Sequence, residues 1–230
     1  MATTLSRTTH LENKARPFTV IVEGNIGSGK TTFLNYFKKY EDLCVLAEPI
    51  ELWRECSGHN LLQYLYEDIN RWGFSFQSYV MLSMLKHHLK ITEHPIKMME
   101  RSIFSARYCF IEKMKMDGLL PSPSHAVLDE WFKWITASCN VSVDLIVYLR
   151  TSPEVVYERM LQRNRKEEKN VSLDYLKQLH EIHEDWLYRR SIFSCPAPVV
   201  TLNANLDQSV LKEEYKKWEP CILNKIQVSI

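Results

Sequence analysis

The sequence predicts an α/β domain in which a parallel sheet of five strands is flanked by helices. Short apolar segments rich in Val, Ile and Leu do not alternate with polar residues, which is typical of parallel strands covered on both faces. Longer segments with helical periodicity separate them, so strands and helices alternate along the chain. The expected strands are Phe18–Glu23, Leu43–Ala47, Ile96–Met99, Leu145–Leu149 and Val199–Leu202.

The composition indicates one domain with a sizeable core. The chain has 230 residues, of which 45% are apolar and 25% are charged. A net charge of +1 argues against a protein that coats nucleic acid or an anionic membrane. No stretch approaches the ~20 apolar residues that cross a bilayer. The six cysteines form no CxxC or CxxH pair, so we expect free thiols in a reducing compartment and no zinc site.

We expect three parts: a flexible tail over residues 1–16, the α/β domain over 17–206, and a C-terminal extension over 207–230. The tail is basic and rich in threonine, and it lacks the apolar run of a secretory signal. It is either a simple tail or the remnant of a mitochondrial presequence. We therefore expect the protein in the cytosol or nucleus, with the mitochondrion as the alternative.

The first predicted strand leads into a glycine-rich turn that decides the class of ligand. Residues 24–31 read Gly-Asn-Ile-Gly-Ser-Gly-Lys-Thr, a full match to G-x-x-x-x-G-K-[ST], and the helical segment Thr32–Tyr40 follows. In such a P-loop the backbone N–H groups and the helix N-terminus face phosphate oxygens. Lys30 would reach the β- and γ-phosphates, and the Thr31 hydroxyl would bind Mg²⁺. The expected nucleotide-binding residues are Gly24, Asn25, Ile26, Gly27, Ser28, Gly29, Lys30, Thr31 and Thr32.

The rest of the chain narrows the P-loop NTPase class to kinases of small molecules. A GTPase would contain the guanine-reading sequence Asn-Lys-x-Asp, which is absent. A motor or AAA-type ATPase places an acidic pair after an apolar strand, whereas the fourth predicted strand ends in Arg150-Thr151.

Charged residues follow the second and third predicted strands directly. Glu48 comes after the second strand, and Glu100 and Arg101 come after the third. Because the carboxyl ends of parallel strands meet at one edge of a sheet, we expect these groups beside the P-loop. Glu48 is then a candidate base for an acceptor hydroxyl, and Glu100 could hold Mg²⁺ through water. The plain alternatives are a solvated loop acid and a surface ion pair.

The helix predicted over Phe74–Leu89 has two apolar stripes. A glutamine in one of them needs partners, because a buried amide left unpaired costs about 1–3 kcal/mol. We expect the stripe of Ser78, Leu82, Leu85 and Leu89 to face the core, with a second stripe of Gln77, Val80 and Met84 beside Phe76.

A later helix and its basic continuation suggest a lid. A helix ends at Gly118 and a loop is expected over Leu120–Ser124. The next helix begins at Thr151-Ser152-Pro153-Glu154, with the spacing of a capping box. Arg159, Arg163 and Lys166 then fall on one helical face. This is either a solvated face or a lid whose arginines close over a transferring phosphoryl group.

Together these segments resemble the deoxyribonucleoside kinase family, closest to the branch of the insect multisubstrate enzyme and the mitochondrial thymidine kinases. The resemblance covers residues 17–190, about three quarters of the chain, and matches poorly over Ser191–Ile230. It rests on residues 18–32, Glu48-Pro49 with Trp53, residues 76–79, 100–108, 148–154 and 179–187.

The resemblance implies an enzyme, usually a homodimer, that transfers the γ-phosphoryl group of ATP to the 5′-hydroxyl of a deoxynucleoside with Mg²⁺. Thymidine, deoxycytidine, deoxyadenosine and deoxyguanosine are the expected substrates, with pyrimidines preferred, and neither nucleic acid nor a membrane is an expected partner. It implies Glu48 as base with Arg101 beside it, Thr31 and Glu100 at the metal, and Arg163 and Arg165 in the lid. For the nucleoside it implies Tyr66 and Glu168 at the sugar, Gln77 at the base edge, Phe76 and Phe110 on the base faces, and Trp53, Val80, Met84 and Ala106 around the pocket.

Two other functions remain open from the sequence. A nucleoside monophosphate kinase would need extra basic residues for the substrate phosphate, where this chain has the acid Glu48. A P-loop protein that only senses nucleotide would not need Lys30, Thr31, Glu48 and Arg101 together.

Overall fold

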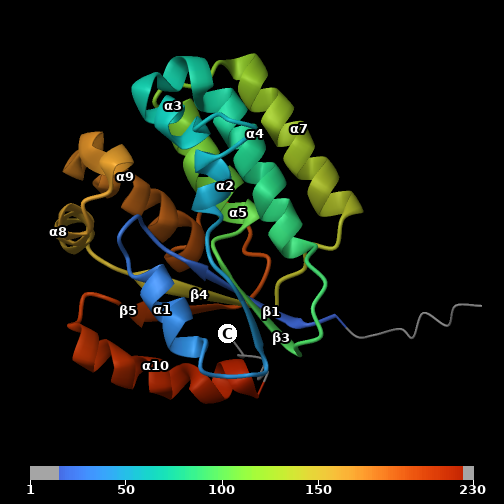
Figure 1. The fold of residues 1–230 in the computed structure, drawn as a ribbon, viewed down its shortest axis with the longest axis vertical. Helices are drawn as coiled ribbons and strands as arrows, with labels where there is room; N and C mark the ends of the chain where they lie inside the picture. Colours follow the sequence, from blue (N-terminus) through green and yellow to red (C-terminus); the bar gives the residue numbers. More distant parts are fainter. Residues whose placement is uncertain (1–15, 225–230) are drawn as a thin grey trace, which may run out of the picture.

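The computed structural model describes residues 16–224 and contains one five-stranded sheet of order β2-β3-β1-β4-β5 (Figure 1). All of its strand pairs are parallel. The prediction of five parallel strands flanked by helices is confirmed, to within one residue at each strand end. The strands are β1 (Phe18–Glu23), β2 (Leu43–Leu46), β3 (Ile96–Glu100), β4 (Leu145–Arg150) and β5 (Val199–Asn203).

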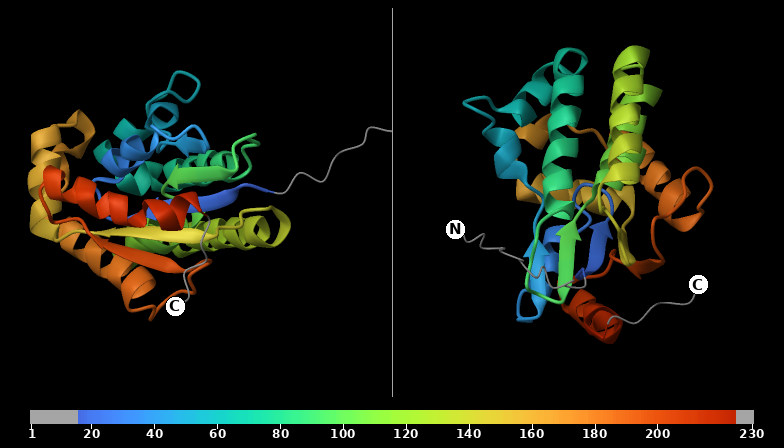
Figure 2. Two further views of the ribbon diagram at one scale, coloured as in Figure 1. Left: turned by 90° about the horizontal axis from the view of Figure 1, so that it is seen from below. Right: turned by 90° about the vertical axis from the view of Figure 1, so that its right-hand side faces the viewer.

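Helices cover both faces of this sheet. Figure 2 shows α4 and α7 side by side on one side of the sheet and α10 on the other. The helices are α1 (Lys30–Phe37), α2 (Ile50–Arg54), α3 (Leu61–Glu67), α4 (Ile69–His88), α5 (Ile103–Ser105), α6 (Glu112–Met116), α7 (Ser122–Ser138), α8 (Pro153–Arg163), α9 (Leu173–His183) and α10 (Gln208–Leu223). Two π-helical segments, η1 (Ala106–Ile111) and η3 (Glu184–Tyr188), and one 3₁₀ segment, η2 (Lys166–Asn170), complete the chain.

The sheet is buried on both faces, which explains its unalternating apolar strands. Ile21 and Ile146 point into a core shared with α4, α7 and α9, and their strand neighbours Val20 and Val147 point into a core shared with α1 and α10. Successive side chains of a strand face opposite ways, so both sets must be apolar.

The predicted C-terminal extension over 207–230 contains α10. Its Leu211 and Tyr215 are buried, and the Tyr215 ring lies edge-on to Phe33 of α1, with centroids 4.9 Å apart. Glu219 of α10 also accepts a hydrogen bond from Lys39 (3.0 Å). The helix that follows the P-loop is therefore packed between the sheet and α10. The predicted tail over 1–16 lies outside the described residues except for Arg16.

The expected core stripe of α4 is wrong. Leu82 and Leu89 are 46% and 45% exposed, whereas Gln77, Val80 and Met84 of the second stripe are buried. Helical periodicity identifies apolar faces, but only the packing of α4 beside η1 and α7 decides which of two apolar faces turns inward.

Three other local predictions are corrected. The loop expected over Leu120–Ser124 is shorter, because α7 begins at Ser122 and accommodates Pro123 in its first turn. The capping box before α8 does not form, since Ser152 is the N-cap without a side-chain hydrogen bond. Lys166 does not continue the helical face of Arg159 and Arg163, because Asn164 ends α8 in a left-handed conformation (φ 49°).

Among residues 16–224, no helix is long and apolar enough to span a membrane. All six cysteines lie in the described part of the chain and none forms a disulfide, as predicted.

His88 at the end of α4 gives the fold a specific acid sensitivity. Its Nε2 accepts a hydrogen bond from the backbone N–H of Ile103 (3.3 Å), and burial, with Lys97 nearby, lowers the pKa of His88 to about 3. Below pH ~6.5 the unfolded chain binds a proton that the folded chain does not, so stability falls as the pH falls.

We predict that His88→Gln, which keeps an acceptor but does not titrate, removes part of this sensitivity. Between pH 7 and pH 5 the free energy of unfolding of the parent should fall by about 1–2 kcal/mol more than that of the variant. Urea denaturation at the two pH values measures the difference. Equal losses in the two proteins would contradict the assignment.

Candidate active site

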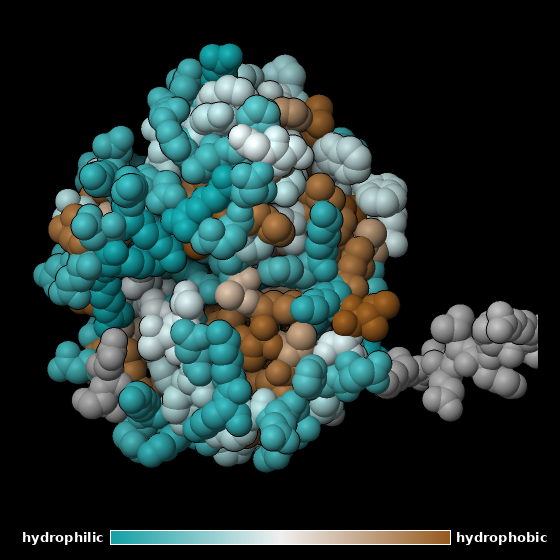
Figure 3. Space-filling model, in the orientation of Figure 1, coloured by the Kyte–Doolittle hydropathy of each residue, from teal (hydrophilic) through white to brown (hydrophobic). Residues whose placement is uncertain are grey.

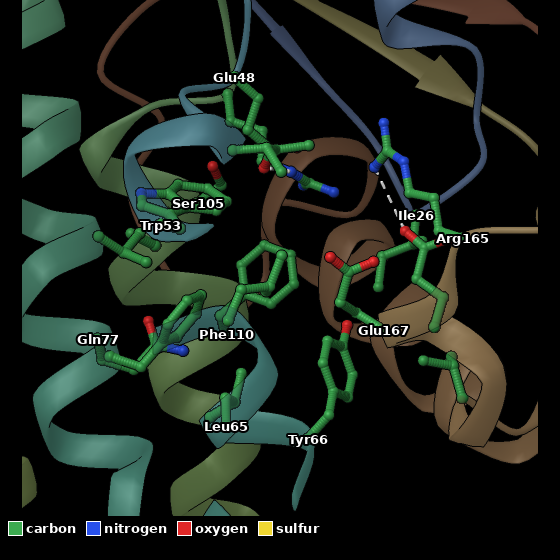
Figure 4. A pocket seen from close by; sticks show the side chains of 18 of the residues that line it. Ile26, Glu48, Trp53, Leu65, Tyr66, Gln77, Ser105, Phe110, Arg165 and Glu167 are labelled. Carbon is green, nitrogen blue, oxygen red and sulfur yellow. Dashed lines mark hydrogen bonds and ion pairs between the residues drawn. The ribbon is translucent and has the colours of Figure 1, made fainter. Parts of the chain in front are cut away.

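A cavity of about 410 Å³ opens at the carboxyl edge of the sheet, between the P-loop, α4, η1 and the segment η2. Figure 4 shows Glu48 at one side of the cavity, Gln77 at another, and Tyr66, Glu167 and Arg165 opposite them, with Phe110 between. The cavity thus spans the distance from the P-loop to α4.

The structure gathers the residues predicted for catalysis, substrate and metal around this one cavity. Their chemical roles stay predictions. The lining includes Lys30, Thr31, Glu48, Trp53, Tyr66, Phe76, Gln77, Val80, Met84, Glu100, Arg101, Ala106, Phe110, Arg163, Arg165 and Glu168. Of the remaining nucleotide-binding candidates, Ile26 and Gly27 line it, and Gly24, Asn25, Ser28, Gly29 and Thr32 do not.

The turn between β1 and α1 needs its glycines. Gly24, Gly27 and Gly29 have φ of 143°, 79° and 92°, and a Cβ on Gly27 would lie 2.6 Å from the carbonyl oxygen of Val156. Asn25 is buried and its side-chain amide donates to the carbonyl of Leu176 (2.8 Å), which fastens the turn to α9. The side chain of Asn25 therefore stabilises the position of the turn relative to α9.

Lys30 lies buried under this turn. Its Nζ donates to the carbonyl oxygens of Asn25 (2.7 Å) and Gly24 (3.2 Å). Burial, followed by the nearby Arg101, lowers the pKa of Lys30 to about 7. A bound anion at the turn would stabilise the charged form of Lys30, so the site favours phosphate.

Arg101 connects the turn to the base candidate Glu48. Its Nη1 donates to the carbonyl of Gly24 (3.1 Å), and its Nε forms an ion pair with Glu48 Oε1 at 2.8 Å, off the direction of a hydrogen bond. Arg101 has φ of 61°, a left-handed conformation that costs a non-glycine residue about 1–3 kcal/mol. This left-handed residue directly follows the end of β3.

Glu23 and Ser102 lie behind this pair and were not identified from the sequence. Ser102 Oγ donates to Glu23 Oε1 (2.6 Å), while Oε2 of the same buried carboxyl has no partner among the described residues. Burial raises the pKa of Glu23 to about 7, against the opposing effect of Arg101. An acid at the last position of a buried strand, directly before the P-loop, was the available signal.

Gln77 lies among mainly apolar side chains where α4 lines the cavity, with Phe76, Val80 and Met84 beside it. The Nε2 of Gln77 lies 3.5 Å from Met114 Sδ, and its buried Oε1 has no partner within the described residues. Trp53 Nε1 donates to Ser83 Oγ (2.9 Å), and its ring lies edge-on to Phe76. The amide oxygen that the sequence required to find a partner is thus left for a ligand.

Phe110, a residue of η1, lies near the middle of the cavity. The Arg101 guanidinium lies 4.7 Å from the centroid of its ring. A π-helical segment adds a residue to a helical turn, and such segments are frequent at functional sites. Here η1 brings both Ala106 and Phe110 to the cavity wall.

The segment after α8 folds back over the cavity. Arg163 Nη2 donates to both carboxylate oxygens of Glu168 (2.7 Å each), and Arg165 Nη1 approaches Oε1 at 3.4 Å. Glu167 and Tyr175 also line the cavity and were not predicted.

The oxygen ligands near the P-loop are of the kind Mg²⁺ prefers. Thr31 Oγ1 donates to Glu100 at 2.9 Å and 3.2 Å. No cluster of three or more His, Cys, Asp or Glu able to hold a metal occurs within residues 16–224. A hydroxyl and one carboxylate fit Mg²⁺, which keeps waters and takes most other ligands from phosphates.

Comparison with known proteins agrees with this site. Residues 20–226 match the model of the family described as deoxynucleoside kinase, which extends the match well beyond the residues 17–190 expected from the sequence. The chain is 46% identical over 212 residues to "Thymidine kinase 2, mitochondrial" of Homo sapiens, covering 92% of this chain and 80% of that protein. It is 34% identical to "Deoxycytidine kinase 2" of Gallus gallus (85% and 86% covered) and 34% identical to "Deoxycytidine kinase" of Mus musculus (90% and 89% covered). The chain belongs to the deoxynucleoside kinase family.

Proposed function

We propose that Glu48 accepts the proton of a deoxynucleoside 5′-hydroxyl while the γ-phosphoryl group of ATP is transferred to it, and that pyrimidine nucleosides are preferred. The observation that carries the proposal is the Glu48–Arg101 ion pair, which lies between the P-loop and the apolar end of the cavity. A hydroxyl there can meet both a carboxylate and a phosphate bound at Lys30.

Five side chains supply charge or ligands for the phosphoryl group. Lys30 holds the phosphates of bound ATP, and Arg163 and Arg165 approach the transferring group from the lid. Thr31 and Glu100 would hold Mg²⁺, which neutralises phosphate charge when bound. Because Arg163 and Arg165 now pair with Glu168, this step requires them to exchange that partner for phosphate.

Residues at the other end of the cavity suit a nucleoside. Gln77 can both donate and accept at a base edge, and Phe76 and Phe110 offer ring faces. Tyr66 and Glu168 both line the cavity, so a sugar 3′-hydroxyl could bond to both. A monophosphate acceptor would bring a further phosphate to Glu48, which is why a nucleoside is the favoured acceptor.

We also propose a homodimer through α4 and α7. Large apolar side chains are exposed on both helices, which are neighbours: Leu82 of α4, Leu89 directly after α4, and Trp131 and Trp134 of α7. In Figure 3 apolar residues gather beside the C-terminal ends of these helices, at the right of the view. Surfaces of this kind are typical of association sites.

We predict that Trp134→Glu converts the dimer to a monomer, because a buried unpaired carboxylate opposes association. Leu161→Glu, at an exposed leucine of α8, is the matched control and should leave the dimer intact. Sedimentation velocity measures both. A parent that is monomeric at micromolar concentration would contradict the proposal.

We predict that Glu48→Gln lowers kcat by about 10²–10⁴ while ATP still binds, because the variant keeps the shape but loses the proton acceptor. The assay follows labelled phosphate from ATP into thymidine or thymidine monophosphate. Transfer to thymidine alone supports a nucleoside kinase. Activity within threefold of the parent would mean that the base lies elsewhere.

Lys30→Ala and Arg163→Ala should fail in different ways. Lys30 serves both bound ATP and the transition state, so ATP affinity and kcat should fall together. Arg163 acts on the charge that develops during transfer, so kcat should fall more than ATP affinity. Equal loss of ATP affinity in the two variants, with no further loss of kcat for Arg163→Ala, would refute the lid role.

All four deoxynucleosides should be phosphorylated, with thymidine and deoxycytidine preferred. Met84 is flexible and Ala106 is small, so neither excludes a purine, and Tyr66 leaves little room for a 2′-hydroxyl. Values of kcat/KM for the four deoxynucleosides, deoxyuridine and uridine provide the measurement. A purine preferred to thymidine, or uridine equal to deoxyuridine, would contradict this view of the pocket.

A further inference from the structure

An ion pair joins two walls of the cavity that lie far apart in sequence. Arg54, the last residue of α2, donates through Nε to Glu167 Oε1 (2.7 Å) and through Nη2 to Oε2 (3.2 Å). Glu167 belongs to η2 and lines the cavity, where Figure 4 shows it next to Tyr66. The ion pair is bidentate, so it fixes the relative orientation of the two side chains as well as their distance.

Each member of the pair is the chain neighbour of a residue proposed to hold the nucleoside. Trp53 precedes Arg54, and its indole is anchored by Ser83 (2.9 Å). Glu168 follows Glu167 and is bonded by Arg163 (2.7 Å). The side of the cavity with Trp53, proposed to contact the base, and the side with Glu168, proposed to contact the sugar, are therefore connected through one salt bridge.

Other polar contacts of the segment do not make this connection. The ion pairs of Glu168 are with Arg163 and Arg165, which belong to the same part of the chain. Among the described residues, the hydrogen bonds from η2 side chains to α2 are those between Glu167 and Arg54. Without them, η2 would keep its contact with α3, and no side-chain hydrogen bond among the described residues would join it to α2.

The pair is shielded on the Glu167 side. The Glu167 side chain is 13% exposed and that of Arg54 is 31% exposed. The hydrogen bond from Arg54 is the main cause that holds the pKa of Glu167 below its ordinary value. Arg54 also pairs with Glu51 (2.8 Å), but that carboxylate is 84% exposed and lies on the same short helix. Of these two pairs, the one with Glu167 joins α2 to η2.

We propose that Arg54 and Glu167 are positioning residues for the nucleoside: their two-pronged ion pair locks η2 onto α2, so that Glu168 and Trp53 hold sugar and base at a fixed separation. The inference rests on the proposed function, because it concerns affinity for the acceptor. ATP binds at the P-loop, away from this contact, and is expected to be insensitive to it.

Glu167→Gln and Arg54→Gln test the proposal, and Glu51→Gln is the matched control. The first two should raise the thymidine KM by about 5–20-fold, since a charge-assisted contact of partial exposure is lost. The KM for ATP and the kcat should stay within about threefold. Glu51→Gln should leave all three values within about twofold of the parent.

Exchanging the two charges distinguishes a loss of substrate positioning from a general destabilisation of the fold. Arg54→Glu and Glu167→Arg alone should each raise the thymidine KM, and the double variant should recover at least half of the loss in log KM. Calorimetric titration with thymidine, without ATP, provides a second readout independent of turnover. Urea denaturation of each variant establishes that it is folded.

The outcomes distinguish the two proposals. If the parent phosphorylates no deoxynucleoside, the proposed function fails. If the parent is active but Glu167→Gln matches Glu51→Gln in thymidine KM and affinity, the positioning role is wrong. Equal rises in the KM for ATP and thymidine, or no recovery in the exchanged pair, would also overturn it.

Discussion

The arrangement of the active site depends on the position of the Arg101 side chain. Its side chain is buried and touches both the carbonyl of Gly24 and the carboxylate of Glu48, so one guanidinium connects the phosphate-binding turn to the proposed base. Its backbone adopts a left-handed conformation as β3 ends. A buried charge is costly unless it is paired, so this cluster is stable only while Arg101 and its acidic partners remain together.

The strand order explains why these groups meet. β1 lies in the centre of the sheet with β3 on one side, and β2 lies beyond β3. The P-loop after β1, Glu100 and Arg101 at the end of β3, and Glu48 after β2 therefore lie at one edge in neighbouring positions. Further residues of the cavity come from α2, α3, α4, η1 and η2, which cover that edge.

Much of this could be predicted from the sequence, because some signals are local. The P-loop has a fixed spacing, and Glu48, Glu100 and Arg101 stand directly after apolar strands, where the fold class alone places them together. Gln77 was identifiable because an amide on an apolar stripe requires a partner. The roles of Tyr66, Phe110 and Glu168 came only from family resemblance, since nothing local distinguishes them.

What could not be predicted depends on tertiary contacts. Leu82 and Gln77 both lie on apolar faces of α4, and only the neighbouring helices decide which face is buried. Arg54 and Glu167 are ordinary charged residues 113 positions apart, and no periodicity relates them. Glu23 stands out as an acid at the end of an apolar strand, but its burial and its contact with Ser102 arise only in the folded sheet.

We infer that Arg101 holds Glu48 and the P-loop in the relative positions that phosphoryl transfer needs. Arg101→Lys keeps the positive charge but lacks the fork that contacts both partners. In a rapid-quench single turnover with ATP and thymidine, we expect this variant to transfer phosphate more slowly by about 10²–10³, with thymidine affinity changed by less than about tenfold. A transfer rate within threefold of the parent would show that Arg101 does not position these groups.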